Sequence, residues 1–310
     1  MSMHNQRQEY GKTLVELGHE NKNIVALEAD LGLSTMSSLF GKEFPERYFE
    51  MGIAEQDMTS FAAGLALGGK IPFVNSFAVF ASGRAYDQIR QSICTANLPV
   101  KIVGSSSGLS DFGDGATHQA IDDMAIMSVL PNMTVLTPCD GIETRKAVRW
   151  AAASEGPVYI RLSRNDLPDV FPEEGVYDPS KPVLLREGTD IVLFSVGIMV
   201  HEALKAAELL QKDGISARVV HIPAAKPMDA EAVRSMAQGV KGIVGCEECS
   251  IYGGINMQLS YIFRGSGIPM EAVAVMDRFG QSAHSHAELL EAYGLTAPHI
   301  VEAAKKTLAE

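Results

Sequence analysis

The sequence contains few residues of several kinds, and each shortage excludes a class of protein. Four of its 310 residues are cysteine, too few and too scattered for a disulfide framework, so a reducing compartment is favoured. Its apolar runs stop well short of the length that crosses a membrane. The first six residues, MSMHNQ, lack the apolar core of a signal peptide. We therefore expect a cytoplasmic protein that has no membrane partner.

Basic residues are also scarce. The chain has 26 lysines and arginines against 38 aspartates and glutamates, which gives a formal net charge of -12. This balance argues against nucleic acid as a partner. It does not exclude a phosphorylated ligand, because a few well-placed arginines or a helix N-terminus can bind one.

A zinc site is incomplete in this sequence. Cys246 and Cys249 have the CxxC spacing of redox and zinc sites, but no second pair completes a set of four ligands. We interpret both as structural thiols.

The chain does have a regular alternation of strand-like and helix-like segments. This alternation predicts an α/β fold whose sheets are mostly parallel and covered by helices on both faces. It lapses over residues 166–189, where four prolines indicate an exposed linker. At this length we expect two doubly wound domains, residues 5–165 and residues 190–310.

The most informative stretch is residues 51–58, MGIAEQDM, which connects a strand-like run to a helix rich in alanine, leucine and glycine. Glu55 lies at that junction, and its simplest role is structural, because the helix dipole favours negative charge in the first turn. A strand over residues 73–77 follows, then Phe80 and a helix that we expect over residues 84–95.

Several candidate residues share one location, at or just after the ends of strand-like runs. Ligands of open parallel sheets bind at the carboxyl ends of the strands, so this shared location predicts a single ligand site. The residues are Asp30, Ser34, Glu55, Phe77, Phe80, Asp114, His118 and Arg164.

Three segments, residues 51–69, 71–88 and 114–119 (DGATHQ), together resemble the pyrimidine-binding domain of thiamine-diphosphate enzymes in the transketolase family. The resemblance runs in order over roughly residues 5 to 305. It implies a pyrimidine-binding domain over residues 5–165. It also implies a smaller transketolase C-terminal-like domain over residues 190–310, which we expect to serve dimerisation.

The resemblance implies roles at the cofactor. Glu55 corresponds to the carboxyl that hydrogen-bonds the cofactor's aminopyrimidine, and Phe77 and Phe80 correspond to rings that pack against it. Asp30 and Leu31 correspond to residues that line the thiazolium in the site of a mate subunit.

Other matching residues are implied to bind substrate. His118 corresponds to a histidine close to the cofactor's amino group, which contacts substrate hydroxyls and can relay protons near neutral pH, although a structural bond to the backbone is the alternative. Asp114 corresponds to a second contact with substrate hydroxyls, and Arg164 to the arginine that grips a sugar phosphate. Arg7 and Ser34 align with further phosphate contacts, although Arg7 could equally be a solvated helix residue.

Two departures from the family stand out. Gly83 occupies a position where transketolases often have a third aromatic residue. Residues 104–107, GSSS, stand where a histidine is common, which leaves the acceptor and the phosphate specificity open.

The metal ligands of the family are missing. Residues 113–115 read Gly-Asp-Gly, like the metal motif, but they belong to the DGATHQ segment, so we assign no metal ligand. The resemblance then implies the C-terminal subunit of a split transketolase, which transfers a two-carbon ketol unit between phosphorylated sugars. A separate N-terminal subunit would hold the diphosphate of thiamine diphosphate and its Mg²⁺ or Ca²⁺, in a heterotetramer built on a dimer of this chain.

Three alternatives remain open. The chain could be half of a deoxyxylulose-phosphate-synthase-like enzyme, because residues 83–88 resemble an arginine-containing stretch of that family. It could be the E1 β-subunit of a 2-oxoacid dehydrogenase, which has a similar length and domain order. A catalytically silent scaffold subunit is the third alternative.

Overall fold

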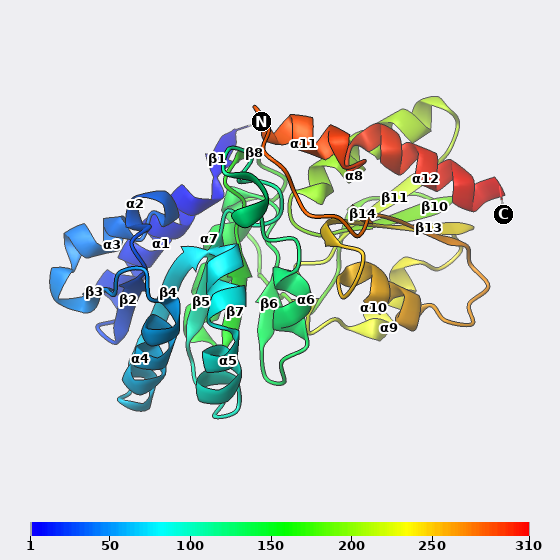
Figure 1. The fold of residues 1–310 in the computed structure, drawn as a ribbon. Helices are drawn as coiled ribbons and strands as arrows, with labels where there is room; N and C mark the ends of the chain where they lie inside the picture. The colour runs from blue at the N-terminus through cyan, green and yellow to red at the C-terminus, as the bar shows by residue number, and fades with distance from the viewer. Residues whose placement is uncertain (1, 310) are drawn as a thin grey trace.

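The computed structural model describes residues 2–309, which form two open sheets lying side by side (Figure 1). The larger sheet has the strand order β12-β6-β7-β5-β4-β2-β3, and the smaller one has the order β14-β13-β10-β11-β9. Neighbouring strands run parallel, except that β12 and β9 are antiparallel to their neighbours at the two sheet edges. The expected fold class, two doubly wound α/β domains with mostly parallel sheets, is confirmed.

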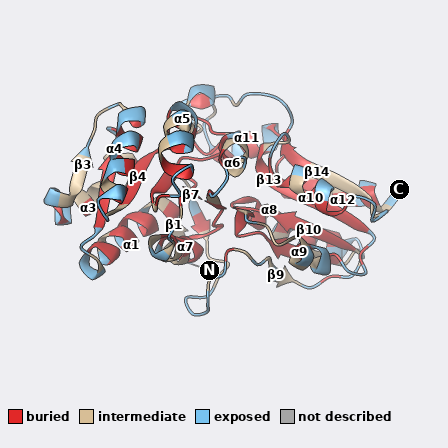
Figure 2. Ribbon diagram, turned by 90° about the horizontal axis from the view of Figure 1, so that it is seen from below, coloured by how far each residue is buried: buried red, intermediate tan, exposed pale blue. Residues whose placement is uncertain are grey.

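The first sheet is built from short apolar strands whose central members are buried on both faces, as helices on both sides require (Figure 2). Helices α1, α3 and α7 pack together, and α4 packs against β4. The strands are β2 (Ile24–Glu28), β3 (Tyr48–Glu50), β4 (Ile71–Phe77), β5 (Lys101–Ser105), β6 (Thr134–Leu136), β7 (Val158–Arg161) and β12 (Ala224–Lys226). The helices are α1 (Gln6–Glu20), α2 (Gly32–Thr35), α3 (Ser38–Glu43), α4 (Glu55–Leu67), α5 (Tyr86–Gln88), α6 (Asp123–Ser128) and α7 (Gly141–Ala153).

In the second sheet, α8 and α12 pack together over one face and α9 and α10 cover the other (Figure 1). Its strands are β9 (Val183–Arg186), β10 (Ile191–Ser195), β11 (Ala217–His221), β13 (Gly242–Ser250) and β14 (Met270–Val275). Its helices are α8 (Met199–Lys212), α9 (Ala230–Met236), α10 (Ile255–Ile262), α11 (His286–Ala292) and α12 (Ala297–Ala309).

Residues 166–189, which we expected to be an exposed linker, contain two strands. β8 (Asp166–Pro168) pairs with β1 (Met3–Asn5), and β9 joins the second sheet. The strand β12 also crosses from the second half of the chain to pair with β6 of the first sheet. The domain boundaries at 165 and 190 stay a prediction.

The helix expected over residues 84–95 is not regular. The chain forms a π-helical segment over Phe80–Arg84, one turn of α-helix in α5 and a second π-helical segment over Ile89–Cys94. Such π-segments occur often at functional sites, and this one follows directly on Phe77 at the end of β4.

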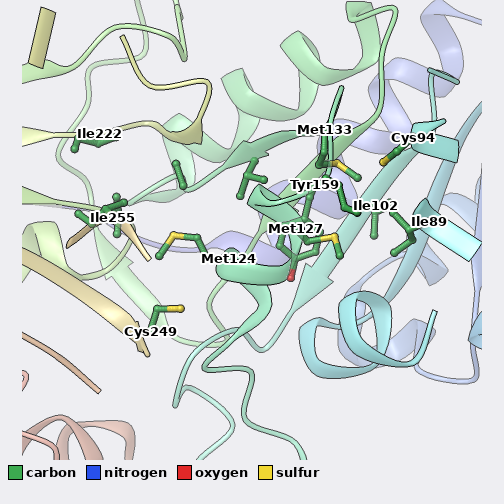
Figure 3. Packing of buried hydrophobic residues seen from close by; sticks show 14 of the residues in the cluster. Ile89, Cys94, Ile102, Met124, Met127, Met133, Tyr159, Ile222, Cys249 and Ile255 are labelled. Carbon is green, nitrogen blue, oxygen red and sulfur yellow. The ribbon is translucent and has the colours of Figure 1, made fainter. Parts of the chain in front are cut away.

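One apolar cluster runs through both halves of the molecule (Figure 3). Met127 and Tyr159 of the first half and Ile222, Cys249 and Ile255 of the second half belong to it, and all are buried. A continuous core of this kind couples the folding of the two halves, because neither can separate without exposing it.

A buried ion pair lies beside this core. Nε of Arg161 donates to both carboxylate oxygens of Asp123 (3.1 and 3.0 Å), and Asp123 also accepts from the hydroxyl of Tyr159 (2.8 Å). A second guanidinium nitrogen of Arg161 donates to the carbonyl of Glu248 in β13 (2.7 Å). Arg161 therefore satisfies buried acceptors from both halves of the chain.

We expect Arg161→Ala to lower the free energy of unfolding by about 3–5 kcal/mol, because it leaves the buried Asp123 carboxylate without its counter-ion. Arg149→Ala is the matched control, since Arg149 pairs with Glu16 and Glu20 at the exposed surface, where such pairs contribute about 1 kcal/mol or less. Urea unfolding of both variants measures the difference. Equal losses in the two variants would contradict the role given to Arg161.

Candidate active site

The predicted site residues gather at one edge of the first sheet, where its parallel strands end. Strands β2, β3, β4, β5 and β7 finish there, and candidates follow within five residues of each strand end except that of β5, where a longer loop intervenes. The candidates are Asp30, Leu31 and Ser34 after β2, Glu55 after β3, Phe77 and Phe80 at and after β4, Asp114 and His118 after β5, and Arg164 after β7.

Glu55 is the first residue of α4, and only 1% of it is exposed. Its carboxylate accepts from Arg84 at both oxygens (3.4 and 3.3 Å), and the Arg84 guanidinium lies 4.7 Å from the centre of the Phe80 ring. The carboxylate is thus shielded from solvent, yet its partner Arg84 is half-exposed. This arrangement presents a buried carboxylate next to a flat aromatic surface.

Three rings form that surface. Phe77 and Phe80 are nearly parallel, with ring centroids 6.3 Å apart and planes 13° apart. His118 meets both edge-on, at 6.2 Å from Phe77 and 5.2 Å from Phe80. A Cβ added at Gly83 would meet nothing within 4 Å, so the position that often holds a third aromatic residue is open space. The residues present therefore fit a flat heteroaromatic ring that stacks on phenylalanine and bonds to Glu55.

Arg164 is held by a carboxylate that we did not predict. Its guanidinium donates to Asp111 (2.7 Å), whose side chain is completely buried and whose second oxygen has no partner. Burial raises the pKa of Asp111, the nearby Arg164 charge opposes this shift, and the neighbouring Asp114 reinforces it. His118 is close enough to act on Asp111 electrostatically, so these four residues form one group of ionisable side chains.

Arg7 belongs to the same group and is not a solvated helix residue. It donates to the carbonyl of Ser34 (2.9 Å) and to the carbonyl of Arg164 (3.1 Å), while its buried Nε has no partner. Burial and the adjacent Arg164 both lower the pKa of Arg7. Two guanidinium groups thus lie together with one unpaired buried donor, an arrangement that suits an anion.

The loop after β2 lies at the same edge of the first sheet. Asp30 has a left-handed backbone (φ 62°), and it lines a depression of about 420 Å³ together with Leu31, Ser34 and Glu50. This loop is organised by Glu28, which is fully buried and was not predicted. Its carboxyl accepts from the backbone N–H of Ala29 and Leu31 and from the hydroxyls of Thr35 and Ser37.

The missed residues differ in how far the sequence could have indicated them. Asp111 lies in the loop that leads to Asp114 and His118, but its pairing with Arg164 joins positions 53 residues apart. Arg84 lies in residues 83–88, which we compared with the deoxyxylulose-phosphate synthase family. Nothing in that stretch of sequence indicated that Arg84 contacts Glu55. Glu28 ends an apolar strand, where a carboxylate looks like an ordinary solvent-facing residue.

One further cluster has metal-ligating residue types. Within residues 2–309, only Cys139, Glu143 and His221 bring three such side chains within 4.8 Å of one another, and Asp114 is not among them. All three are buried, and the Glu143 carboxylate already accepts from the ring of His221 (2.9 Å) and from the N–H of Cys139 (2.7 Å). These hydrogen bonds account for the cluster as a contact between the two halves of the chain. Among residues 2–309, no helix is long and apolar enough to cross a bilayer.

Known proteins share this architecture. The family models for the transketolase pyrimidine binding domain and the transketolase C-terminal domain match residues 3–170 and 180–300. A Methanocaldococcus jannaschii protein, provisionally named a transketolase C-terminal section, is 41% identical over 97% of this chain and 96% of its own length. The 6-deoxy-6-sulfo-D-fructose transketolase subunit SqwH of Clostridium sp. (strain MSTE9) is 40% identical over 96% of this chain and 92% of its own.

A solved structure is similar over nearly the whole chain. It is described as a split gene transketolase, inactive beta4 tetramer, and it matches with a TM-score of 0.89 and 46% identity over 98% of each chain.

The buried Glu28 makes a prediction about pH. Burial raises the pKa of Glu28 from 4.5 to about 7, so the folded state favours its protonated form. The protonated Glu28 carboxyl therefore contributes fully to the free energy of unfolding below pH 4.5, and this contribution is lost as the pH rises to about 7 and above. We would measure urea unfolding of the wild type and of Glu28→Gln from pH 4.5 to 8. The free energy of unfolding of the wild type should fall by roughly 3 kcal/mol relative to that of Glu28→Gln between pH 4.5 and 7, and should change little at higher pH. Parallel profiles of the two proteins would contradict a raised pKa of Glu28.

Proposed function

This chain belongs to the transketolase family, and we propose that it is the C-terminal subunit of a split, thiamine-diphosphate-dependent transketolase. It would transfer a two-carbon ketol unit between phosphorylated sugars, in an active site completed by a separate N-terminal subunit. The observation that carries the proposal is the buried Glu55 carboxylate at the start of α4, beside the nearly parallel rings of Phe77 and Phe80.

The cofactor's pyrimidine ring would bind at this surface. When bound, thiamine diphosphate supplies a thiazolium carbon that becomes nucleophilic once its proton has left. With the cofactor bound, Glu55 would exchange its contact with Arg84 for one with the pyrimidine ring and hold a proton there, and its burial would keep water from that proton. Phe77 and Phe80 would orient the ring by stacking, and His118 would lie at its edge to exchange a proton with substrate. By family resemblance, Asp30 and Leu31 would line the thiazolium in a mate's site.

The arginine pair would bind the anionic end of the sugar. Arg7 donates to the backbone carbonyls of Ser34 and Arg164, and its unpaired buried Nε leaves a donor available. Asp114 belongs to the same group of ionisable side chains as Arg164 and is exposed, so its carboxylate can bond to sugar hydroxyls. The similar Clostridium subunit is named for a sulfonated sugar, so a phosphate or a sulfonate is consistent with the same guanidinium pair.

The partner subunit would supply what this chain lacks. In the proposed assembly the N-terminal transketolase subunit holds the cofactor's diphosphate and its Mg²⁺ or Ca²⁺. The similar split-gene chain is described as inactive when it forms a tetramer of β-chains, which agrees with a need for a partner. We infer a heterotetramer that contains a dimer of this chain. All four cysteines are free and buried, which suits the reducing cytoplasm.

Glu55→Gln in the complex with the N-terminal subunit should lower kcat by about a hundredfold or more, because glutamine keeps the shape but cannot exchange a proton with the ring nitrogen. The rate of deuterium exchange at the cofactor's C2, followed by NMR, should fall in parallel. Cofactor affinity should change little, since the side-chain volume is kept.

Asp57→Asn is the matched control, because Asp57 lies in the same first helical turn but is exposed. If Glu55 only stabilised the helix start, both variants would lose about 0.3–1 kcal/mol of stability and exchange normally. Wild-type exchange in Glu55→Gln would therefore refute its catalytic role.

A further inference from the structure

The second half of the chain reaches the loop that carries the candidate substrate residues. Glu248 of β13 has a side chain only 1% exposed, and its Oε1 accepts from the backbone N–H of Leu109 (3.0 Å). Leu109 lies two residues before Asp111, the carboxylate that binds Arg164. We expected the second domain to serve dimerisation, yet it contacts the loop directly.

His286, at the start of α11, connects the same carboxylate to a second segment of the site. The amide of Asn165 donates to Nδ1 of His286 (2.6 Å), so the opposite nitrogen, Nε2, carries the proton and donates to Oε1 of Glu248. Asn165 directly follows Arg164 in the chain. Glu248 and His286 thus form a hydrogen-bonded bridge from β13 to the segment that carries Arg164.

The backbone around this bridge leaves it little freedom. Gly108 has a left-handed conformation (φ +61°), and a Cβ there would lie 2.1 Å from Oε2 of Glu248. The loop can therefore approach the carboxylate this closely only because residue 108 has no side chain. The carbonyl of Glu248 also accepts from Arg161 (2.7 Å), which fixes the strand on the other side.

The two contacts converge on one ion pair. One runs through Leu109 to the loop of Asp111, and the other runs through Asn165 to the backbone of Arg164. Ser110 adds a link between the two segments, because its hydroxyl accepts from the N–H of Arg164 (3.3 Å).

We propose that Glu248 and His286 are positioning residues that hold Asp111 and Arg164 in register for the anionic group of the substrate. This inference rests on the proposed function, in which Arg164 binds that group. The second domain then contributes to substrate affinity through the first domain, and it does so without touching the substrate.

A double-mutant cycle in the complex with the N-terminal subunit tests this. His286→Ala should raise KM for a phosphorylated ketose about tenfold, and should change kcat, or KM for an unphosphorylated ketose, by no more than about twofold. If His286 acts through Arg164, the same substitution should add almost nothing in an Arg164→Ala background. A full tenfold effect in that background, or an equal effect on both ketoses, would overturn the proposal.

Two further variants separate positioning from general loss of structure. Glu248→Gln keeps the shape and can still accept from Leu109, so its effect on KM should be smaller than that of His286→Ala. Glu247→Gln is the matched control, since Glu247 is the next residue of β13 and equally buried, but bonds only to Ile255 and Asn256 of the second half. Burial already raises the pKa of Glu247 to about 7, so glutamine is a mild change there. If Glu247→Gln raised KM for the phosphorylated ketose as much as His286→Ala does, the proposal would be overturned.

Binding of inorganic phosphate to this chain alone distinguishes failure of the inference from failure of the proposed function. We expect phosphate titrations followed by NMR to show weaker binding for Arg164→Ala and for His286→Ala, and no further loss in the double variant. An inactive wild-type complex with this phosphate pattern would refute the transketolase activity and leave the positioning role standing. Unchanged phosphate affinity in His286→Ala, or no phosphate binding by the wild type, would refute the positioning role itself.

Discussion

The site depends on one constraint, the parallel direction of five neighbouring strands in the first sheet. Because β3, β2, β4, β5 and β7 all end at one edge, side chains far apart in the sequence meet there, and Arg7 bonds to a backbone carbonyl 157 positions away at Arg164. The same edge brings a buried carboxylate, Glu55, to a pair of phenylalanine rings. The aromatic surface of Phe77 and Phe80 and the ionisable group around Arg164 share only one residue, His118. A shift of one strand in register would therefore move the two apart.

The two halves of the chain are more interdependent than two domains joined by a linker. Strand β12 of the second half completes the first sheet, one apolar cluster runs through both halves, and Arg161 bonds to acceptors in each. This coupling gives the second half a means to affect the site, because the contact of Glu248 with Leu109 ends two residues from Asp111. Substitutions in β13 or α11 can therefore change substrate affinity at a distance.

The sequence was informative where the signal is local. The alternation of strands and helices predicted the fold class, and neighbouring residues predicted the junction of strand and helix at Glu55. The roles given to Glu55, Phe77 and Phe80 came from the family resemblance. Pairings between distant positions, such as Asp111 with Arg164, have no local signal, because hydrophobic periodicity does not encode which polar groups meet. The π-helical segments over Phe80–Arg84 and Ile89–Cys94 were missed for a different reason, because their apolar pattern resembles that of an α-helix.

In the proposed assembly, this chain provides the pyrimidine side of a cofactor site and a second subunit provides the diphosphate side. This division is tested by calorimetric titration of thiamine diphosphate with magnesium into this chain, into a candidate N-terminal transketolase subunit, and into their mixture. The account predicts tight, magnesium-dependent binding in the mixture and not in this chain alone. Tight, magnesium-dependent binding by this chain without a partner would contradict it.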